Sequence, residues 1–287
     1  MQQLRFPQTK NEIEKKYGFE LNIKEPYDPK EFVDILSRVA RDYWAGIHHP
    51  LAQLFLEGKL TKEQLRIWAI EEYWFYKGPN YWSAAEIANA PELEDQELLF
   101  DPLLTEIGSE KEEGHVKLYL KYLNALGVSY EELINTPLLP TTIVAVSEFY
   151  NICKYLSLAE AIAAEKIAGE YINRERHALY VEAFRKYYTW IPEEAIQFHK
   201  AHVEEDVRHS QIGIYLAQKY ASTKEAQNRM WDAAIRFLAL YWTLYEGIYQ
   251  VAVNGVNMPR FPVNPTFPLQ YCQSNPIPKP QIKLKTV

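Results

Sequence analysis

Helix-start signals recur along this chain, and no stretch shows the alternating apolar and polar pattern of a half-buried β-strand. Asp28-Pro29 is typical of a helix N-cap followed by proline at the first helical position. Capping boxes of the form Ser/Thr-x-x-Glu/Gln precede apolar residues at helical spacing; they begin at Thr61, Ser129, Ser157 and Ser222. Prolines that would stop or kink a helix fall between the periodic segments, at 79, 91, 137, 140 and 192. The sequence therefore predicts an all-α bundle of eight to ten helices.

The two ends differ from this periodic body. Residues 1–28 are polar, hold Pro7 and Pro26, and are expected to form an arm packed on the body. Residues 29–255 are expected to form one helical domain, with Asn254-Gly255 capping its last helix. In residues 256–287, prolines 259, 262, 265 and 268 recur every third residue, which matches a polyproline II turn. This tail is predicted to be an extended strap on the body rather than a partner-binding motif.

Charge and cysteine content narrow the class of protein. Asp and Glu outnumber Lys and Arg by 38 to 31, which argues against nucleic acid as a partner. No apolar run reaches the roughly 18 residues of a membrane span, and the N-terminus lacks a signal-peptide core. The two cysteines, Cys153 and Cys272, form no CxxC pair. We therefore expect a cytoplasmic protein that acts on neither membranes nor nucleic acid.

One segment carries a stripe of metal-ligand side chains. At about 100° per residue, Asp206 and His209 fall within roughly 40° of His202 on one helix face, with His199 at the edge of the stripe. Two histidines and a carboxylate suit iron, manganese or zinc. A hydrogen-bonded surface cluster is the alternative, but apolar Phe198 and Ile212 nearby favour a buried metal site.

A two-metal site needs more ligands from facing helices. Glu170 is one candidate, and Glu165 is its rival. Glu106 and His115 are others, although they would lie on opposite faces of one straight helix and converge only if it is interrupted. Gly108 and Gly114 make such an interruption plausible, whereas the rival pair, Glu112 with His115, needs none.

From Tyr43 to about Ala252 the sequence resembles the pyrroloquinoline quinone synthase (PqqC) and TenA group, which has the heme-oxygenase-like fold. The stretches that carry the resemblance are Ile47-His-His-Pro50, Leu60-Thr-Lys-Glu-Gln-Leu65, Ile87-Ala-Asn-Ala-Pro91, Ala125-Leu-Gly-Val-Ser129, Thr189-Trp-Ile191, Asp206-Val-Arg-His209 and Gln227-Asn-Arg-Met230. Pyrroloquinoline quinone synthase is a cofactor-free oxidase that holds its substrate with arginines. This chain has Glu72 and His199 at the corresponding places.

His115 and His202 instead resemble a metal-binding branch, the heme-oxygenase-like di-iron oxidases and oxygenases. The branch has Glu, then His, then Glu, then His-x3-Asp-x2-His. The matching positions are Glu106, His115, Glu170, His202, Asp206 and His209. This resemblance implies that those six residues are catalytic and bind two Fe(II), or a manganese–iron pair, with dioxygen as co-substrate. It also implies a small amine, amino-acid or fatty-acid substrate and an external electron donor. We further expect a homodimer.

Three alternatives remain open. A PqqC-like, cofactor-free oxidase predicts arginine clamps. A TenA-like hydrolase of thiamin fragments needs a nucleophilic cysteine, for which Cys153 is the candidate. A non-enzymatic protein would use the proline-rich tail. Of the remaining polar residues, His48 and His49 are predicted to make structural hydrogen bonds, His177 to lie on a solvated helix face, and Lys166 to lie outside the site.

Overall fold

The computed structural model describes residues 6–7, 9–109 and 112–268, without the side chains of 204–207. In this described part the chain forms helices and no β-strand, so the all-α prediction is confirmed. The first helices are α1 (Lys10–Tyr17), α2 (Pro29–Tyr43), α3 (Ala45–His48), α4 (Pro50–Leu56), α5 (Lys62–Tyr76), α6 (Pro79–Asn89), α7 (Leu93–Ile107) and α8 (His115–Ala125). They are followed by α9 (Tyr130–Asn135), α10 (Pro140–Tyr155), α11 (Leu158–Ile162), α12 (Asn173–Tyr187), α13 (Gln197–Tyr220) and α14 (Lys224–Ala252).

Most of the predicted caps lie where the sequence puts them. Asp28 caps α2, and reciprocal capping boxes at Thr61 and Ser157 start α5 and α11. Ser129 caps α9 through its side chain. The cap predicted at Ser222 is wrong by one residue, because Thr223 accepts the hydrogen bond from the main chain of Ala226 and starts α14. The structure has more segments than the eight to ten predicted, because short helices such as α3, α4 and α9 join the long ones.

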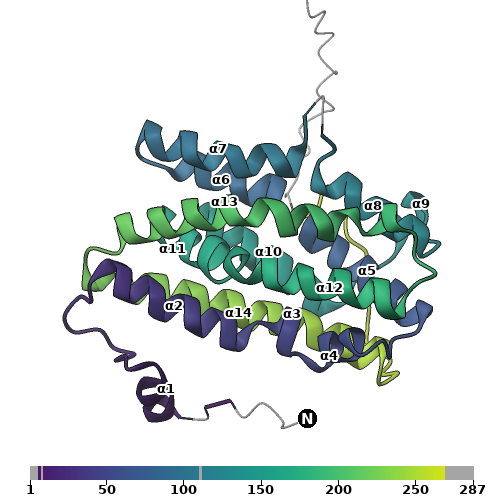
Figure 1. The fold of residues 1–287 in the computed structure, drawn as a ribbon, viewed down its shortest axis with the longest axis horizontal. Coiled ribbons are helices and arrows are strands. Elements are labelled where there is room, and N and C mark those ends of the chain that lie inside the picture. The colour runs from purple at the N-terminus through teal and green to yellow at the C-terminus, as the bar shows by residue number, and fades with distance from the viewer. Residues whose placement is uncertain (1–5, 8, 110–111, 269–287) are drawn as a thin grey trace, which may run out of the picture.

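The long helices form a layered bundle (Figure 1). Helix α14 packs against α10 and α2, and α13 packs against α12. The hairpin of α6 and α7 lies along one edge, where α6 contacts α10 and α7 contacts α13. Bulky aromatic side chains such as Trp44, Trp74 and Trp82 fill the interior, as expected for aromatic residues at helical spacing. No helix among the described residues is long and apolar enough to cross a bilayer.

One helix of the bundle interior is irregular. After α11 the backbone forms a π-helical turn, η1 (Ala163–Ile167), and then a 3-10 turn, η2 (Glu170–Ile172). Ala168 donates its N–H to the carbonyl of Ala163 five residues earlier, at 3.0 Å. A Cβ at Gly169 would lie 2.4 Å from the carbonyl oxygen of Glu165, so only glycine fits there. Such single π turns occur often at functional sites; this one carries Glu165 and Lys166, and Glu170 follows in η2.

The N-terminal arm contains a helix, α1, that its polar sequence did not predict. Beyond it, the side chains of Phe19 and Ile23 are buried against the body, and Phe19 packs on Trp231 with ring centroids 4.6 Å apart. Side chains of α14 fix the arm's backbone: Gln227 bonds to the main chain of Tyr27, and Asn228 to that of Ile23.

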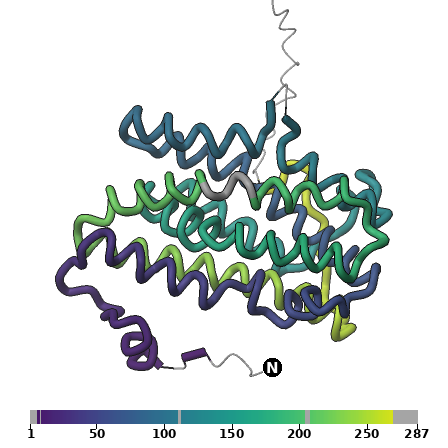
Figure 2. The backbone as a smooth tube through the Cα atoms, in the orientation of Figure 1, coloured from purple at the N-terminus to yellow at the C-terminus, as the bar shows by residue number. Residues whose placement is uncertain are grey.

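The C-terminal segment lies against the body as far as residue 268, and Figure 2 shows it crossing one end of the bundle. Phe261 pairs with Leu138 through two main-chain hydrogen bonds of 2.9 Å. Arg260 Nη1 donates to Oε1 of the fully buried Glu71 at 2.6 Å. The rest of the proline-rich tail, with Cys272, lies outside the described residues.

Replacing Arg260 with alanine is expected to lower the free energy of unfolding by about 2 kcal/mol, because Glu71 would keep its burial and lose its only cationic partner among the described residues. Partial exposure of Arg260 keeps the loss below that of a fully buried pair. Urea denaturation measures the change. The control is Arg236→Ala, which breaks an exposed pair with Glu148 and should change stability by at most about 0.5 kcal/mol. Equal losses in the two variants would contradict the role given to Glu71.

Candidate functional site

Three metal-ligand side chains from three helices meet in the interior. Glu106 on α7, His115 at the start of α8 and His202 on α13 each place one ligand atom within 4.8 Å of the other two. Nδ1 of His115 lies 3.0 Å from Oε1 of Glu106. The rings of His115 and His202 pack with centroids 4.2 Å apart. All three side chains are buried, so the arrangement differs from a solvated surface cluster.

A break between α7 and α8 lets Glu106 and His115 converge. Gly108 ends α7 with φ +85° and pairs with Glu113 across an isolated bridge. A Cβ at Gly114 would lie 2.3 Å from the carbonyl oxygen of Ile107, so the chain can return this closely only with glycine there. The rival Glu112 is exposed on the outer side of this loop. The interruption that the two glycines predicted is therefore present.

His202 is prepared to act as a ligand. Its Nδ1 donates to the carbonyl oxygen of Phe198 at 2.8 Å, which leaves the lone pair on Nε2. Burial, with a contribution from the neighbouring His115, lowers the pKa of His202 well below its ordinary value. A neutral imidazole held by a second hydrogen bond is the form that binds metals.

A carboxylate cluster lies beside these histidines. Lys166 Nζ, fully buried, is 2.9 Å from Glu170 Oε1, 3.3 Å from Glu165 Oε1 and 3.9 Å from Glu86 Oε2. Gly213 of α13 makes room for the lysine stem, since a Cβ there would lie 2.5 Å from Cβ of Lys166. The expectation that Lys166 lies outside the site is wrong, because the π turn directs it inward.

The pKa values of the three buried acids shift by different net amounts, because their charged neighbours differ. Burial raises the pKa of Glu86 well above the ordinary value, and the adjacent Glu165 carboxylate adds to the shift. Burial also raises the pKa of Glu170, to about 7, even though Lys166 opposes the shift. Burial would raise the pKa of Glu165 too, but Lys166 and the hydrogen bond from Ser83 bring it below its ordinary value. Three buried carboxyl groups therefore share the single ammonium group of Lys166.

A cavity of about 60 Å³ joins the histidine and carboxylate sides. Glu106, Glu165, Glu170 and His202 all line it. Of the other predicted ligands, His209 is buried but lines a separate hollow of about 730 Å³ between α7 and α13. The side chain of Asp206 lies outside the described part of the chain. The structure thus brings together four of the six predicted residues.

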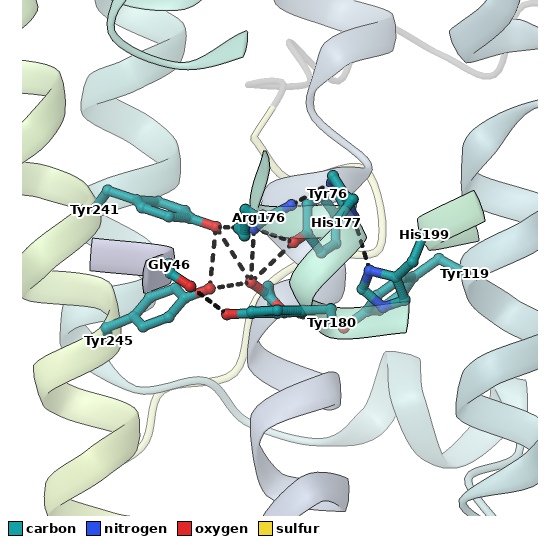
Figure 3. Close-up of polar contacts among 10 residues, drawn as sticks. Gly46, Tyr76, Tyr119, Arg176, His177, Tyr180, His199, Tyr241 and Tyr245 are labelled. Atoms are coloured by element: carbon teal, nitrogen blue, oxygen red, sulfur yellow. Dashed lines mark hydrogen bonds and ion pairs between the residues drawn. The ribbon is translucent and has the colours of Figure 1, made fainter. Parts of the chain in front are cut away.

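A second polar network occupies the interior next to this cavity (Figure 3). Glu72 Oε1 accepts from Tyr76 at 2.9 Å and from Tyr245 at 2.9 Å. Arg176 Nη1 donates to the hydroxyls of Tyr76 and Tyr241, at 2.8 and 2.7 Å. Its Nη2 donates to Nε2 of His177 at 2.6 Å. The network holds the guanidinium rigidly at the wall of the cavity.

The prediction that His177 lies on a solvated helix face is wrong. His177 is fully buried rather than solvated: its Nδ1 lies 2.8 Å from Nδ1 of His199, and its ring stacks on His202 with centroids 4.3 Å apart. Arg176 is not predicted as a site residue for the same reason, because the charged residues around it are typical of a solvated helix face. A signal was present, because Arg176, His177, Tyr180 and Phe184 share one face at helical spacing. His48 and His49 make structural hydrogen bonds as predicted, to Arg41 O and to the N–H of Leu51.

Cys153 has acidic neighbours without the features of a nucleophile. Its Sγ lies near carboxylate oxygens of Glu86 and Glu165. Burial and the Glu86 charge raise the pKa of the thiol well above its ordinary value. The side chain is fully buried and does not line the cavity, so no thiolate is presented to a substrate there.

The chemistry of the donors fits a metal. Neutral imidazole together with carboxylate oxygens suits iron, manganese or zinc. Oε2 of Glu165 and Oε2 of Glu170 accept no hydrogen bond from the described residues, although both atoms are buried. Buried carboxylate oxygens normally have a partner, and a bound cation would supply one.

The chain matches known proteins over most of its length. The sequence model of the "TENA/THI-4/PQQC family" matches residues 38–247. The pyrroloquinoline-quinone synthase of Klebsiella pneumoniae (strain 342) is 24% identical over 227 residues, which cover 79% of this chain and 89% of that protein. The enzyme of the same name from Pseudomonas putida is 25% identical over 224 residues, covering 78% and 88%.

Solved structures show the same fold. A TenA homolog from Pseudomonas syringae pv. tomato superposes with a TM-score of 0.65 at 17% identity, covering 79% of this chain and 94% of that one. A CADD-like protein of unknown function from Nostoc punctiforme superposes with a TM-score of 0.62 at 17% identity, covering 78% and 98%. A domain from Shewanella denitrificans, described as having a heme oxygenase-like fold, gives a TM-score of 0.62. The predicted heme-oxygenase-like architecture is therefore confirmed.

Proposed function

Since the chain belongs to the TENA/THI-4/PQQC family, we propose that it is an oxidoreductase that uses dioxygen to oxidise a small substrate at a pair of iron ions. The observation that carries the proposal is the meeting of Glu106, His115 and His202 within 4.8 Å in the interior. Iron bound there would supply the activation of dioxygen.

The residues of this chain have separate tasks in the proposal. Glu106, His115 and His202 would hold one cation, and Glu170, which lines the same cavity as Glu106 and His202, would help to hold the second. Asp206 and His209 remain proposed ligands on the helix of His202. Lys166 balances the charge of Glu165 and Glu170, and the apolar walls, including Phe75, Phe149 and Phe237, keep water from the cavity.

A second candidate is the activity named for the relatives, a PqqC-like oxidation without a metal. Sequence similarity over most of both chains favours it. Arg176 on the cavity wall also supports it, since that reading requires arginine at the substrate site. Glu72 and His199 weigh against it, because they stand where the relatives are expected to use arginine.

Metal analysis separates the two candidates. Protein purified without oxygen and incubated with Fe(II) is expected to retain about two iron ions per chain, from the number of ligands available. Mixing with dioxygen in a stopped-flow spectrometer should then give a transient absorption band that metal-free protein lacks. Protein that retains neither iron nor manganese, yet consumes dioxygen with a quinone precursor, would support the second candidate and end the first.

A further inference from the structure

We propose that the cavity has a second functional end, a carboxylate-binding site formed by Trp44 and Arg176, and that the substrate is a small carboxylic acid whose opposite end faces the proposed metal ligands. The inference rests on the proposed function only for the reaction at the end of the substrate that faces the metal ligands. The carboxylate-binding site itself is argued from other observations. It narrows the expected substrates to acids, amino acids among them, and excludes simple amines.

Two N–H donors at this end have no acceptor. Nε1 of Trp44 and Nε of Arg176 are buried, and within the described residues neither donates a hydrogen bond. The side chains are 2% and 1% exposed, so bulk water does not serve them. An unsatisfied buried donor costs about 1–3 kcal/mol, so such donors point to a missing acceptor.

The side chains that carry the two donors lie next to each other at the same cavity. Both side chains line the cavity that holds Glu106, Glu170 and His202. Both also lie against Gly46: a Cβ there would be 2.5 Å from Arg176 Cδ and 2.9 Å from Trp44 Nε1. Glycine at this position leaves the space in which the two side chains sit side by side.

Nη1 and Nη2 of Arg176 each have a hydrogen-bond partner already, so Nε is the one nitrogen of the guanidinium without an acceptor among the described residues. Nη1 donates to Tyr76 and Tyr241, and Nη2 to His177. These bonds fix the plane of the guanidinium, which lowers the ordering cost of binding. The nearest carboxylate, Oε1 of Glu72, lies 3.8 Å from Nη1 and is shared with the tyrosine hydroxyls.

The charges across the cavity select the orientation of a ligand. The lining of the cavity includes the acids Glu106, Glu165 and Glu170 and also the guanidinium of Arg176. A carboxylate is repelled by the acids and attracted by Arg176, beside which it can accept from both Nε and Nε1. The cavity volume of about 60 Å³ fits a short molecule better than a long acyl chain.

Calorimetric titration of the metal-free protein with butyrate tests the binding site without reference to metal chemistry. Butyrate is expected to bind, whereas butyramide and butylamine at the same concentrations should bind at least tenfold more weakly, because only the carboxylate brings a charge to Arg176. Equal binding of butyrate and butyramide, or no butyrate binding to either metal-free or iron-loaded protein, would overturn the proposal.

Trp44→Phe is the decisive variant because it keeps an aromatic ring beside Tyr241 and removes the Nε1 donor together with part of the indole. It should weaken butyrate binding by roughly tenfold, as expected for a hydrogen bond to a charged group. The matched control is Trp68→Phe, which removes another buried Nε1 without an acceptor, at a residue that does not line this cavity. The control should bind butyrate like the wild type, and an equal loss in both variants would refute the site. Failure of iron uptake would count against the proposed function alone.

Discussion

Replacing His202 with alanine is expected to abolish tight iron binding and dioxygen-dependent turnover together. His202 belongs to the cluster with Glu106 and His115 and also lines the cavity that Glu170 lines. Changes to residues that merely support a metal ligand lower affinity about 10–100-fold, so loss of a ligand should exceed roughly 100-fold. Iron content after anaerobic loading and desalting measures the loss, and oxygen consumption measures turnover.

His48→Ala is the matched control for that variant. Both histidines bond to a main-chain carbonyl, His48 to Arg41 O at 3.0 Å and His202 to Phe198 O at 2.8 Å. His48 lies outside the cavity, so its replacement should leave the iron content unchanged. Circular dichroism verifies that both variants are folded. A folded His202→Ala protein that keeps the iron content of the wild type would rule out the proposed centre.

Replacing Lys166 with methionine is expected to destabilise the metal-free protein by about 3–5 kcal/mol, the range for breaking a buried ion pair. Methionine preserves the length of the stem, and Glu165 and Glu170 remain without their cation. Guanidinium denaturation of chelator-treated protein measures the change. Added Fe(II) or Mn(II) should restore part of the stability, because a divalent cation can neutralise the same carboxylates.

The pH dependence of this variant has a definite sign. Burial already raises the pKa of Glu170 to about 7 in the presence of Lys166, and removal of the ammonium raises it further. A carboxyl whose pKa is higher in the folded state than in the unfolded state contributes stability at low pH and loses it as the pH rises. The deficit of Lys166→Met relative to wild type should therefore be larger at pH 8 than at pH 5.5.

Lys219→Met is the control for Lys166. Lys219 also pairs with two acids, Glu92 at 2.6 Å and Asp95 at 2.7 Å, but its side chain is 24% exposed. Its removal should lower stability by at most about 1 kcal/mol, since water can solvate what remains. Similar losses of stability in the two variants at all pH values would show that Glu165 and Glu170 do not depend on Lys166 for their burial.

The fold could be predicted from the sequence because its signals are local. Capping residues such as Asp28 and Thr61 and prolines such as Pro140 act within one helical turn, so they mark helix starts without knowledge of the partners. Helix α1 was missed because its sequence is mostly polar, although the structure anchors its end through the buried Tyr17, whose hydroxyl donates to Asp42. The N-cap of α14 was predicted at Ser222 but lies at Thr223, because either of two adjacent hydroxyl residues can cap a helix.

The site was predictable in part. Gly108 and Gly114 predict a local break that the structure contains. Of the predicted stripe, His202 lies in the cluster, whereas His209 lines a separate hollow. The inward placement of Lys166, Arg176 and His177 depends on which partners a charged side chain finds in the interior, and a single helix does not encode that. Each of these three is buried only because groups from other segments, such as Glu86, Tyr241 and His199, compensate it.

The π turn at Ala163–Ile167 has a consequence for how relatives of this chain are aligned. One surplus residue in a helical turn rotates everything after it by about 100° relative to what precedes it. A homologue one residue shorter between Ser157 and Gly169 would keep the letter Glu at the aligned position while directing that carboxylate away from His202. The length of the segment between Ser157 and Gly169 therefore has to match, as well as the glutamate itself, before a relative can be assigned the same carboxylate position.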